Sequence, residues 1–324
     1  MQSELSKIMF CNRCGEKELE LSIDCRDDIE ILEGRLSCNS CDNFYAIREG
    51  IVDTIAGKTI TELLTAKEND EPETSKMNEW LFSLPTPKYH VRDTTYEHKG
   101  GDKALNFFDV LSRMKLKGNE TILEFGCGNC WATNIFAKKG CKCVAVDVRM
   151  RRYYGLRSGK IMINHFDRYF ERVLSDLQNP AFVAGSFDII FAQSSLQYAD
   201  NLNYCLGNIH TLLRPGGKLV LAYNGVYGLL KRKGKGSPGY YVTTLLRAMK
   251  RAGFEYELIF PAYVKKYLED RIPNGKKFAT VGNIVSFIWN TWPHAVNRIE
   301  KHGQVPMHLV FGVPLNLIAE KQKQ

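Results

Sequence analysis

The sequence predicts an α/β fold in which a small N-terminal module precedes a doubly wound, Rossmann-like sheet of seven strands. Two observations predict the sheet: the apolar run 121–124 leads into a Gly126-x-Gly128 turn, and a second apolar run ends in Asp147. A strand, a glycine-rich turn, a helix and a strand that ends in a carboxylate are typical of a nucleotide-binding βαβ unit. A third observation, two Cys-x-x-Cys motifs near the N-terminus, predicts the module.

The bulk composition is that of a soluble globular protein. Of the 324 residues, 44% are hydrophobic and 25% are charged. We expect no signal peptide and no transmembrane helix, since the chain starts without a long apolar segment and has no run of ~18 apolar residues. Several of the ten cysteines lie in apolar, core-like segments, which favours a reducing, cytoplasmic location.

The N-terminal cysteines predict a metal centre. Two Cys-x-x-Cys pairs flank two runs of alternating apolar residues, at 19–23 and 29–36, which we interpret as a hairpin. Four thiolates brought together in this way suit tetrahedral Zn²⁺ at ~2.3 Å per bond, and a closed site with four protein ligands is structural. The predicted ligands are Cys11, Cys14, Cys38 and Cys41. Cys25, within the hairpin, is not expected to bind the metal.

The remaining elements follow from the spacing of apolar residues and from glycine and proline. The sequence 214–217, Arg-Pro-Gly-Gly, is expected to end a helix because proline lacks an N–H and glycine accepts positive φ. Gly253 is expected to stop a later helix in the same way. The predicted helices are 131–139, 202–213 and 242–252, and the further predicted strands are 186–191, 218–223, 254–261 and 313–319.

These motifs together resemble a known family. The sequence Glu124-x-Gly126-x-Gly128 followed by Asp147, with Gly-Ser-Phe-Asp at 185–188 and the 214–217 sequence downstream, resembles the class I S-adenosylmethionine-dependent methyltransferases. The resemblance covers roughly residues 105–261 and 309–321. Trp131 stands where a dinucleotide-binding loop has a small residue, and Cys130 stands where many members of the family have a third glycine.

The resemblance implies that the protein is an enzyme with S-adenosylmethionine as cofactor. It assigns Gly126 and Gly128 to the methionine end, Asp147 to the ribose hydroxyls, and Asp176 to the adenine amine. The full set of implied cofactor-binding residues is Glu124, Gly126, Gly128, Asp147, Val148, Asp176, Leu177, Gln193 and Tyr96. No catalytic base is identified, and Gln193, Tyr198 and Tyr223 are candidates for the reaction pocket.

The N-terminal region carries a second resemblance. Residues 36–53 contain a Cys pair followed by Tyr-x-Ile-x-x-Gly-Ile, which resembles the zinc module of the small transfer-RNA-methyltransferase activator family. We therefore expect a zinc-ribbon module at 1–56, a linker and cofactor-covering segment at 57–104, and a methyltransferase domain at 105–324. An aromatic-rich insertion is expected at about 264–308.

The sequence leaves three functions open. The first is direct, in-line methyl transfer to a small or lipid-linked acceptor, since the nucleic-acid methylation signatures are missing after the fourth strand. The second is methylation of ribosomal or transfer RNA, favoured by the net charge of +8 and by basic clusters at 149–160 and 231–235. An acidic face around the first Cys pair argues against RNA as the acceptor, because it would repel phosphates. The third is a non-catalytic, zinc-bearing adaptor. The oligomeric state is not set by any of these patterns.

Overall fold

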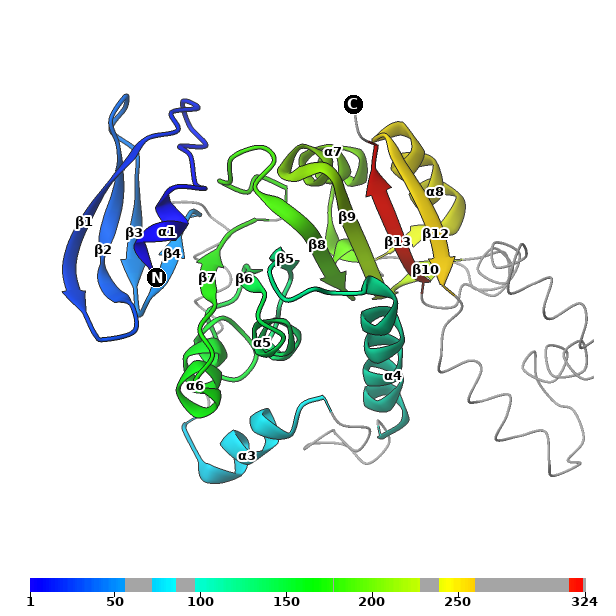
Figure 1. The fold of residues 1–324 in the computed structure, drawn as a ribbon, viewed down its shortest axis with the longest axis horizontal. Coiled ribbons are helices and arrows are strands. Elements are labelled where there is room, and N and C mark those ends of the chain that lie inside the picture. The colour runs from blue at the N-terminus through cyan, green and yellow to red at the C-terminus, as the bar shows by residue number, and fades with distance from the viewer. Residues whose placement is uncertain (56–71, 86–96, 177, 228–238, 260–314, 323–324) are drawn as a thin grey trace, which may run out of the picture.

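The computed structural model (Figure 1) describes residues 1–55, 72–85, 97–176, 178–227, 239–259 and 315–322, with the backbone alone at 97–102. Its main feature is an eleven-stranded sheet with the order β1-β2-β3-β4-β7-β6-β5-β8-β9-β13-β12. The predicted 264–308 insertion and most of the predicted 57–104 segment, with Tyr96, lie outside the described residues, as does Leu177.

Seven of these strands form the predicted doubly wound sheet. They are β5 (Thr121–Phe125), β6 (Lys142–Asp147), β7 (Glu171–Leu174), β8 (Phe187–Gln193), β9 (Leu213–Asn224), β12 (Phe254–Ile259) and β13 (Leu315–Lys321). β7, β6, β5, β8 and β9 run parallel to one another, whereas β13 is antiparallel to both β9 and β12. Every residue of β5 and β6 after the first is buried, as expected for a parallel sheet covered on both faces.

Helices cover both faces of this sheet. One hydrophobic core contains α7 (Leu202–Leu212), α8 (Val242–Arg251) and the short α1 (Ser3–Ser6). The other contains α3 (Ser75–Ser83), α4 (Glu97–Met114), α5 (Trp131–Lys138) and α6 (Arg157–Phe166). The helices predicted at 131–139, 202–213 and 242–252 are thus confirmed. Small elements complete the structure: the 3-10 turn η2 (Leu196–Tyr198) and the pair β10 (Val226–Tyr227) and β11 (Tyr240–Tyr241).

The end of α7 differs in detail from the prediction. The helix stops at Leu212, and β9 begins at Leu213, so the 214–217 sequence lies inside the strand instead of forming a separate loop. The terminal carbonyls are satisfied from the last strand. Lys321 Nζ donates to the carbonyl oxygens of His210 and Leu213, each at 2.8 Å. A cation at a helix C-terminus also interacts favourably with the helix dipole.

The N-terminal module continues the main sheet. β1 (Leu19–Arg26), β2 (Ile31–Cys38) and β3 (Phe44–Arg48) are antiparallel to one another in sequence order, which confirms the predicted hairpin. β4 (Ile51–Asp53) then pairs in parallel with β7, in the register Val52↔Val173. Thr54 adds two hydrogen bonds, from its N–H and its hydroxyl, to the Leu174 carbonyl. The module therefore covers one edge of the seven-strand sheet.

A buried ion pair lies at this junction. Arg172 of β7 is 1% exposed at its side chain and donates through Nη2 to both carboxylate oxygens of Glu30 at 2.8 Å. Lys160 of α6 contacts the same carboxylate at 2.8 Å and Asp27 at 2.9 Å. Gly159 makes room for the arginine, since a Cβ there would lie 2.7 Å from Arg172 Cδ.

The junction also accounts for the basic cluster that the sequence shows after Asp147. Lys160 pairs with Asp27 and Glu30, and Arg157 pairs with Glu49 at 2.9 Å. Outside the module, Arg152 pairs with Glu73 at 3.1 Å. Much of the cluster's charge is therefore neutralised within the chain. Asp27 and Glu30, two of the acidic partners of this basic cluster, lie in the turn of the predicted hairpin.

Candidate cofactor site and zinc centre

The candidate site lies at the carboxyl ends of β5, β6, β7 and β8. β5 is the central strand, and the chain continues from it to β6 and β7 on one side and to β8 and β9 on the other. In doubly wound sheets the loops on the two sides of such a switch point diverge and leave a crevice, which is where ligands bind. The predicted cofactor residues Glu124, Asp147 and Gln193 stand at the ends of three of these strands.

The two glycines of the loop after β5 are needed for different structural reasons. Gly126 has φ +69°, and its N–H donates to the Val146 carbonyl at 2.8 Å. A Cβ on Gly126 would collide with the Ser195 side chain. Gly128 has φ +56°, and the position of its absent Cβ has no atom within 4 Å. A side chain at 128 would project into open space at the crevice, so this is where a ligand can approach the backbone.

Asp147 is tied to this loop through both carboxylate oxygens. Oδ2 accepts from the Gly128 N–H at 2.8 Å, and Oδ1 accepts from the Arg149 N–H at 3.0 Å. The amide of Val148 also favours the ionised form, but burial outweighs these contacts and raises the pKa of Asp147 to about 6. The group is therefore mainly ionised at neutral pH. Each oxygen can still accept a ligand hydroxyl, since a carboxylate oxygen has two lone pairs.

Glu124 lies beneath the loop in the interior. Burial raises its pKa to about 8, and the Thr133 hydroxyl of α5 donates to its Oε2. The side chain is thus mainly protonated at neutral pH in the cofactor-free protein. A cation that approached it would favour the ionised form and lower this pKa.

The end of β7 places the third predicted carboxylate beside Asp147. Asp147 pairs with Leu174 across β6 and β7, and the Ser175 N–H donates to the Asp147 carbonyl at 3.0 Å. Asp176 follows directly. Its Oδ1 accepts from the Gln178 N–H at 2.9 Å, and the side chain is half-buried. The loops after β5, β6 and β7 thus bring Gly128, Asp147 and Asp176 to one edge of the sheet.

The pocket candidates lie at the ends of β8 and β9. Gln193 Nε2 donates to the Lys103 carbonyl of α4 at 3.2 Å, while its buried Oε1 has no hydrogen-bond partner among the described residues. Tyr223 has φ +51°, and its carbonyl accepts from the Ser194 hydroxyl at 2.9 Å. Tyr198 in η2 is 64% exposed. Left-handed conformations at residues other than glycine are disfavoured, and they cluster at functional sites.

Ser195 is a residue that the sequence reasoning missed. Its hydroxyl donates to the Phe125 carbonyl at 2.6 Å, so it joins the loop after β8 to the end of β5. Its side chain also occupies the space beside Gly126. The only sequence signal was a small polar residue four positions after the predicted strand 186–191. Such a signal does not show which neighbouring loop the residue contacts.

Two residues of the loop depart from the expected pattern, with different structural consequences. Cys130, at the position of the family's third glycine, adopts φ +61° and ψ +16°, the left-handed conformation that favours glycine. Trp131, which would hinder the close packing of a dinucleotide-binding helix, turns its ring edge-on to Phe107 of α4 with the ring centres 4.6 Å apart. It joins an aromatic cluster with Phe136 and Phe191 instead.

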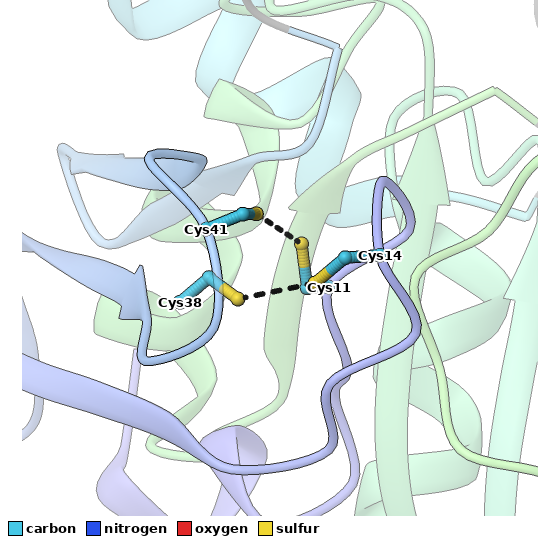
Figure 2. Close-up of side chains that lie close together, drawn as sticks. All are labelled: Cys11, Cys14, Cys38 and Cys41. Atoms are coloured by element: carbon cyan, nitrogen blue, oxygen red, sulfur yellow. Dashed lines mark hydrogen bonds between the residues drawn. The ribbon is translucent and has the colours of Figure 1, made fainter.

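The four cysteines predicted to bind zinc converge (Figure 2). Their sulfur atoms all lie within 4.8 Å of one another, with Cys11 and Cys41 at 3.7 Å and Cys14 and Cys38 at 3.4 Å. A tetrahedron of ~2.3 Å Zn–S bonds places its sulfurs about 3.8 Å apart, so the donor set fits zinc. Cys25 is exposed on β1 and is not in this group.

Neighbouring polar groups donate hydrogen bonds to two of the cysteine sulfur atoms. Asn43 Nδ2 donates to Cys11 Sγ at 3.3 Å, and the Ser40 N–H donates to Cys38 Sγ at 3.4 Å. Donors of this kind stabilise thiolates and orient them toward a metal. In the described part of the chain, this is the single group of three or more Cys, His, Asp or Glu side chains close enough to share an ion.

Comparisons with known proteins support this description. Residues 123–221 match the family model described as a methyltransferase domain. A malonyl-[acyl-carrier protein] O-methyltransferase from Enterobacter lignolyticus is 23% identical over 34% of this chain and 41% of its own length. A ubiquinone biosynthesis O-methyltransferase from Xanthomonas euvesicatoria is 29% identical over 35% of this chain and 46% of its own. The chain thus spans less than half the length of these relatives.

A solved structure shares the fold. Phosphoethanolamine N-methyltransferase 2 from Haemonchus contortus, in complex with S-adenosyl-L-methionine, superposes with a TM-score of 0.50. It is 16% identical, over 87% of this chain and 62% of its own. The protein therefore has the α/β fold of the class I methyltransferases, and residues 123–221 match a methyltransferase domain. Within the described residues, no helix combines the length and apolar character needed to cross a membrane.

Proposed function

We propose that the protein is an S-adenosylmethionine-dependent methyltransferase that transfers a methyl group directly, in line, to a small or lipid-linked acceptor. The arrangement of Asp147 and Gly128 carries this proposal: a buried carboxylate is held beside a glycine whose missing side chain leaves open space. This arrangement lies at the switch point of the sheet and within the segment that matches the methyltransferase domain. An adaptor without catalytic function would need neither feature.

The predicted cofactor-binding residues are proposed to hold three parts of the cofactor. Gly126 and Gly128 shape the loop that would hold the methionine end of the cofactor, with Glu124 beneath it. Asp147 accepts hydrogen bonds from the ribose hydroxyls, while Val148 and Asp176 line the adenine end. When bound, the cofactor supplies a methyl group already activated by its sulfonium, so alignment of the acceptor and exclusion of water provide much of the rate.

Gln193 is proposed to orient the acceptor, because its Oε1 is buried and no described residue donates a hydrogen bond to it. Tyr198 and Tyr223 complete the pocket candidates on the β8 and β9 side. A small-molecule acceptor is supported by the two relatives, which are both named as O-methyltransferases. The RNA alternative loses much of the free positive charge on which it depended, since Arg152, Arg157 and Lys160 have acidic partners within the chain.

The cysteine cluster is proposed to bind one structural Zn²⁺. All four positions would be filled by Cys11, Cys14, Cys38 and Cys41, so no position remains open for a substrate or a water molecule. Its contribution would be to the folding of the module, and through β4 to the edge of the cofactor sheet.

The test is calorimetric titration of S-adenosylhomocysteine into the zinc-loaded protein after removal of nucleic acid. We expect micromolar binding that Asp147→Ala loses and that the matched variant Asp24→Ala, on the exposed surface of β1, retains. Absence of binding in the folded protein would overturn the proposal and favour the adaptor function. If binding is found, labelled cofactor and parallel panels of small molecules and ribosomal RNA identify the class of acceptor.

A further inference from the structure

The glycine-rich loop contains a pair of thiols that the proposed mechanism does not use. Cys127 and Cys130 are 5% and 0% exposed, and their sulfur atoms lie 3.6 Å apart. The Cys130 N–H donates to the Cys127 carbonyl at 2.9 Å, so the two residues form the ends of one tight turn. Gly128, which faces the open crevice, lies within this turn.

The backbone at Cys130 makes the thiol unexpected. Its φ of +61° is unfavourable for any residue with a side chain, and glycine would adopt it without strain. A cysteine at this position is not explained by local conformation. It is also not explained by a metal, because the pair has no third ligand among the described side chains.

We propose that Cys127 and Cys130 form a reversible disulfide that weakens cofactor binding. This proposal rests on the proposed function, since it concerns the same loop. An S–S bond is about 2.05 Å long, so the two sulfur atoms must approach by about 1.5 Å. Gly128 and Asn129 lie between them, and their backbone must move with the sulfurs. The Gly128 N–H would then shift relative to Asp147, whose Oδ2 it contacts at 2.8 Å in the reduced loop.

The reaction is balanced with a small-molecule disulfide such as oxidised glutathione as the oxidant. One cysteine thiolate attacks a sulfur of the oxidant and releases the first glutathione thiolate. The second cysteine attacks the resulting mixed disulfide and releases the second. The two cysteines lose two electrons and two protons, and the two glutathione thiolates take up those protons.

The rate of this reaction has two controls. Burial raises the pKa of the Cys127 thiol, so little thiolate is present at neutral pH and oxidation should speed up as the pH rises. Both thiols are also inaccessible in the closed turn, so the loop must open before it reacts. A ligand that holds the loop closed should therefore slow oxidation. By linkage, the disulfide should lower the affinity for that ligand by the same factor by which the bound ligand lowers the equilibrium constant of disulfide formation.

The experiment compares the reduced and the oxidised zinc-loaded protein. S-adenosylhomocysteine affinity is first measured on reduced protein, which tests the proposed function separately. The protein is then incubated with oxidised glutathione, and its free thiols are alkylated. The mass of the tryptic peptide 118–138 is measured by mass spectrometry. This peptide contains Cys127 and Cys130 and no other cysteine. We expect it to be recovered with an internal disulfide, more slowly when S-adenosylhomocysteine is present at saturation.

Two variants separate this pair from the other cysteines, and each is compared with its own reduced form. Cys205→Ala, which changes a buried thiol in α7, should lose at least tenfold in affinity on oxidation, as the wild type does. Cys130→Gly should show no change on oxidation. Reduction with dithiothreitol should restore the wild type. Recovery of the 118–138 peptide with both thiols free would overturn the proposal, and so would a disulfide that leaves the affinity unchanged.

Discussion

The Asp147 carboxylate accepts a hydrogen bond of 2.8 Å from the backbone N–H of Gly128, nineteen positions earlier in the chain. This contact joins the end of β6 to the loop after β5. It orients the carboxylate at the point where the missing side chain of Gly128 leaves open space. In the proposed cofactor site, the affinity for the ribose hydroxyls would therefore depend on the charge of Asp147.

Cofactor affinity should therefore depend on pH through Asp147. Its pKa is about 6, and the ionised form accepts hydrogen bonds more strongly than the protonated form, in which one oxygen carries a proton. We expect the dissociation constant of S-adenosylhomocysteine to rise up to about tenfold per pH unit below pH 6, and to stay level just above it. Calorimetry from pH 5 to 8 measures this. Asp147→Asn should bind weakly and without the same pH dependence; an equal slope in that variant would contradict the assignment.

Stability should depend on pH through Glu124. Its folded pKa is raised to about 8, and its unfolded pKa is about 4.3. Between these values the folded state binds more protons than the unfolded state, so the free energy of unfolding falls as the pH rises. The slope from this group is at most about 1.4 kcal/mol per pH unit. Urea unfolding at pH 5, 6.5 and 8 should show a shallower decline in Glu124→Gln than in the wild type. Parallel declines would rule out this residue as the source.

Removal of zinc should unfold the N-terminal module. A structural zinc site contributes folding free energy directly, so chelation should lower the melting temperature, and Cys38→Ser should prevent stoichiometric binding. Cys25→Ser is the matched control, because Cys25 is exposed on the neighbouring strand and lies outside the sulfur cluster. Metal analysis and thermal unfolding report both quantities. A protein that retained one zinc without Cys38 would refute the ligand set.

Loss of Arg172 should destabilise the junction between the module and the sheet. Arg172→Met leaves the buried Glu30 carboxylate with Lys160 as its remaining side-chain cation, so we expect a cost near the low end of the roughly 3–5 kcal/mol that breaking a buried ion pair typically has. Addition of Glu30→Gln should recover part of that loss, because the buried charge that has lost its main partner is then removed. Arg157→Met breaks an ion pair with Glu49 that is partly exposed, and should cost less than about 1 kcal/mol. Chemical denaturation of the four proteins measures the difference, and equal costs for the two single variants would contradict the argument.

The sequence predicted the seven-strand sheet and its helices well because the evidence for them is local. The buried strands are apolar runs, and α8 has apolar residues at helical spacing that ends at Gly253. The convergence of the four cysteines could also be predicted, since a hairpin joins the two pairs. The boundary between α7 and β9 differs from the prediction, because Arg-Pro-Gly-Gly is compatible with both a loop and an irregular strand.

The contacts between distant segments could not be predicted. Nothing in Val52 or Val173 indicates that these two residues pair, because each lies in an apolar run that could have faced any strand. The basic cluster after Asp147 had the composition of a nucleic-acid surface, and only the fold shows Lys160 beside Asp27. Ser195 was missed for the same reason, because its role depends on a loop 70 residues away. The roles of the predicted cofactor-binding residues and pocket candidates remain predictions, as do the expected domain boundaries.

The pairing of β4 with β7 has a consequence for how the chain folds during synthesis. The hydrogen bonds of Thr54 to Leu174 join residues 120 positions apart, so β4 leaves the ribosome long before the strand that it pairs with. Until then one edge of the module is unpaired and available to other strands. Early metal binding would keep the three-strand hairpin region ordered through this interval. The supply of zinc would then influence how much of the newly made protein reaches the folded state.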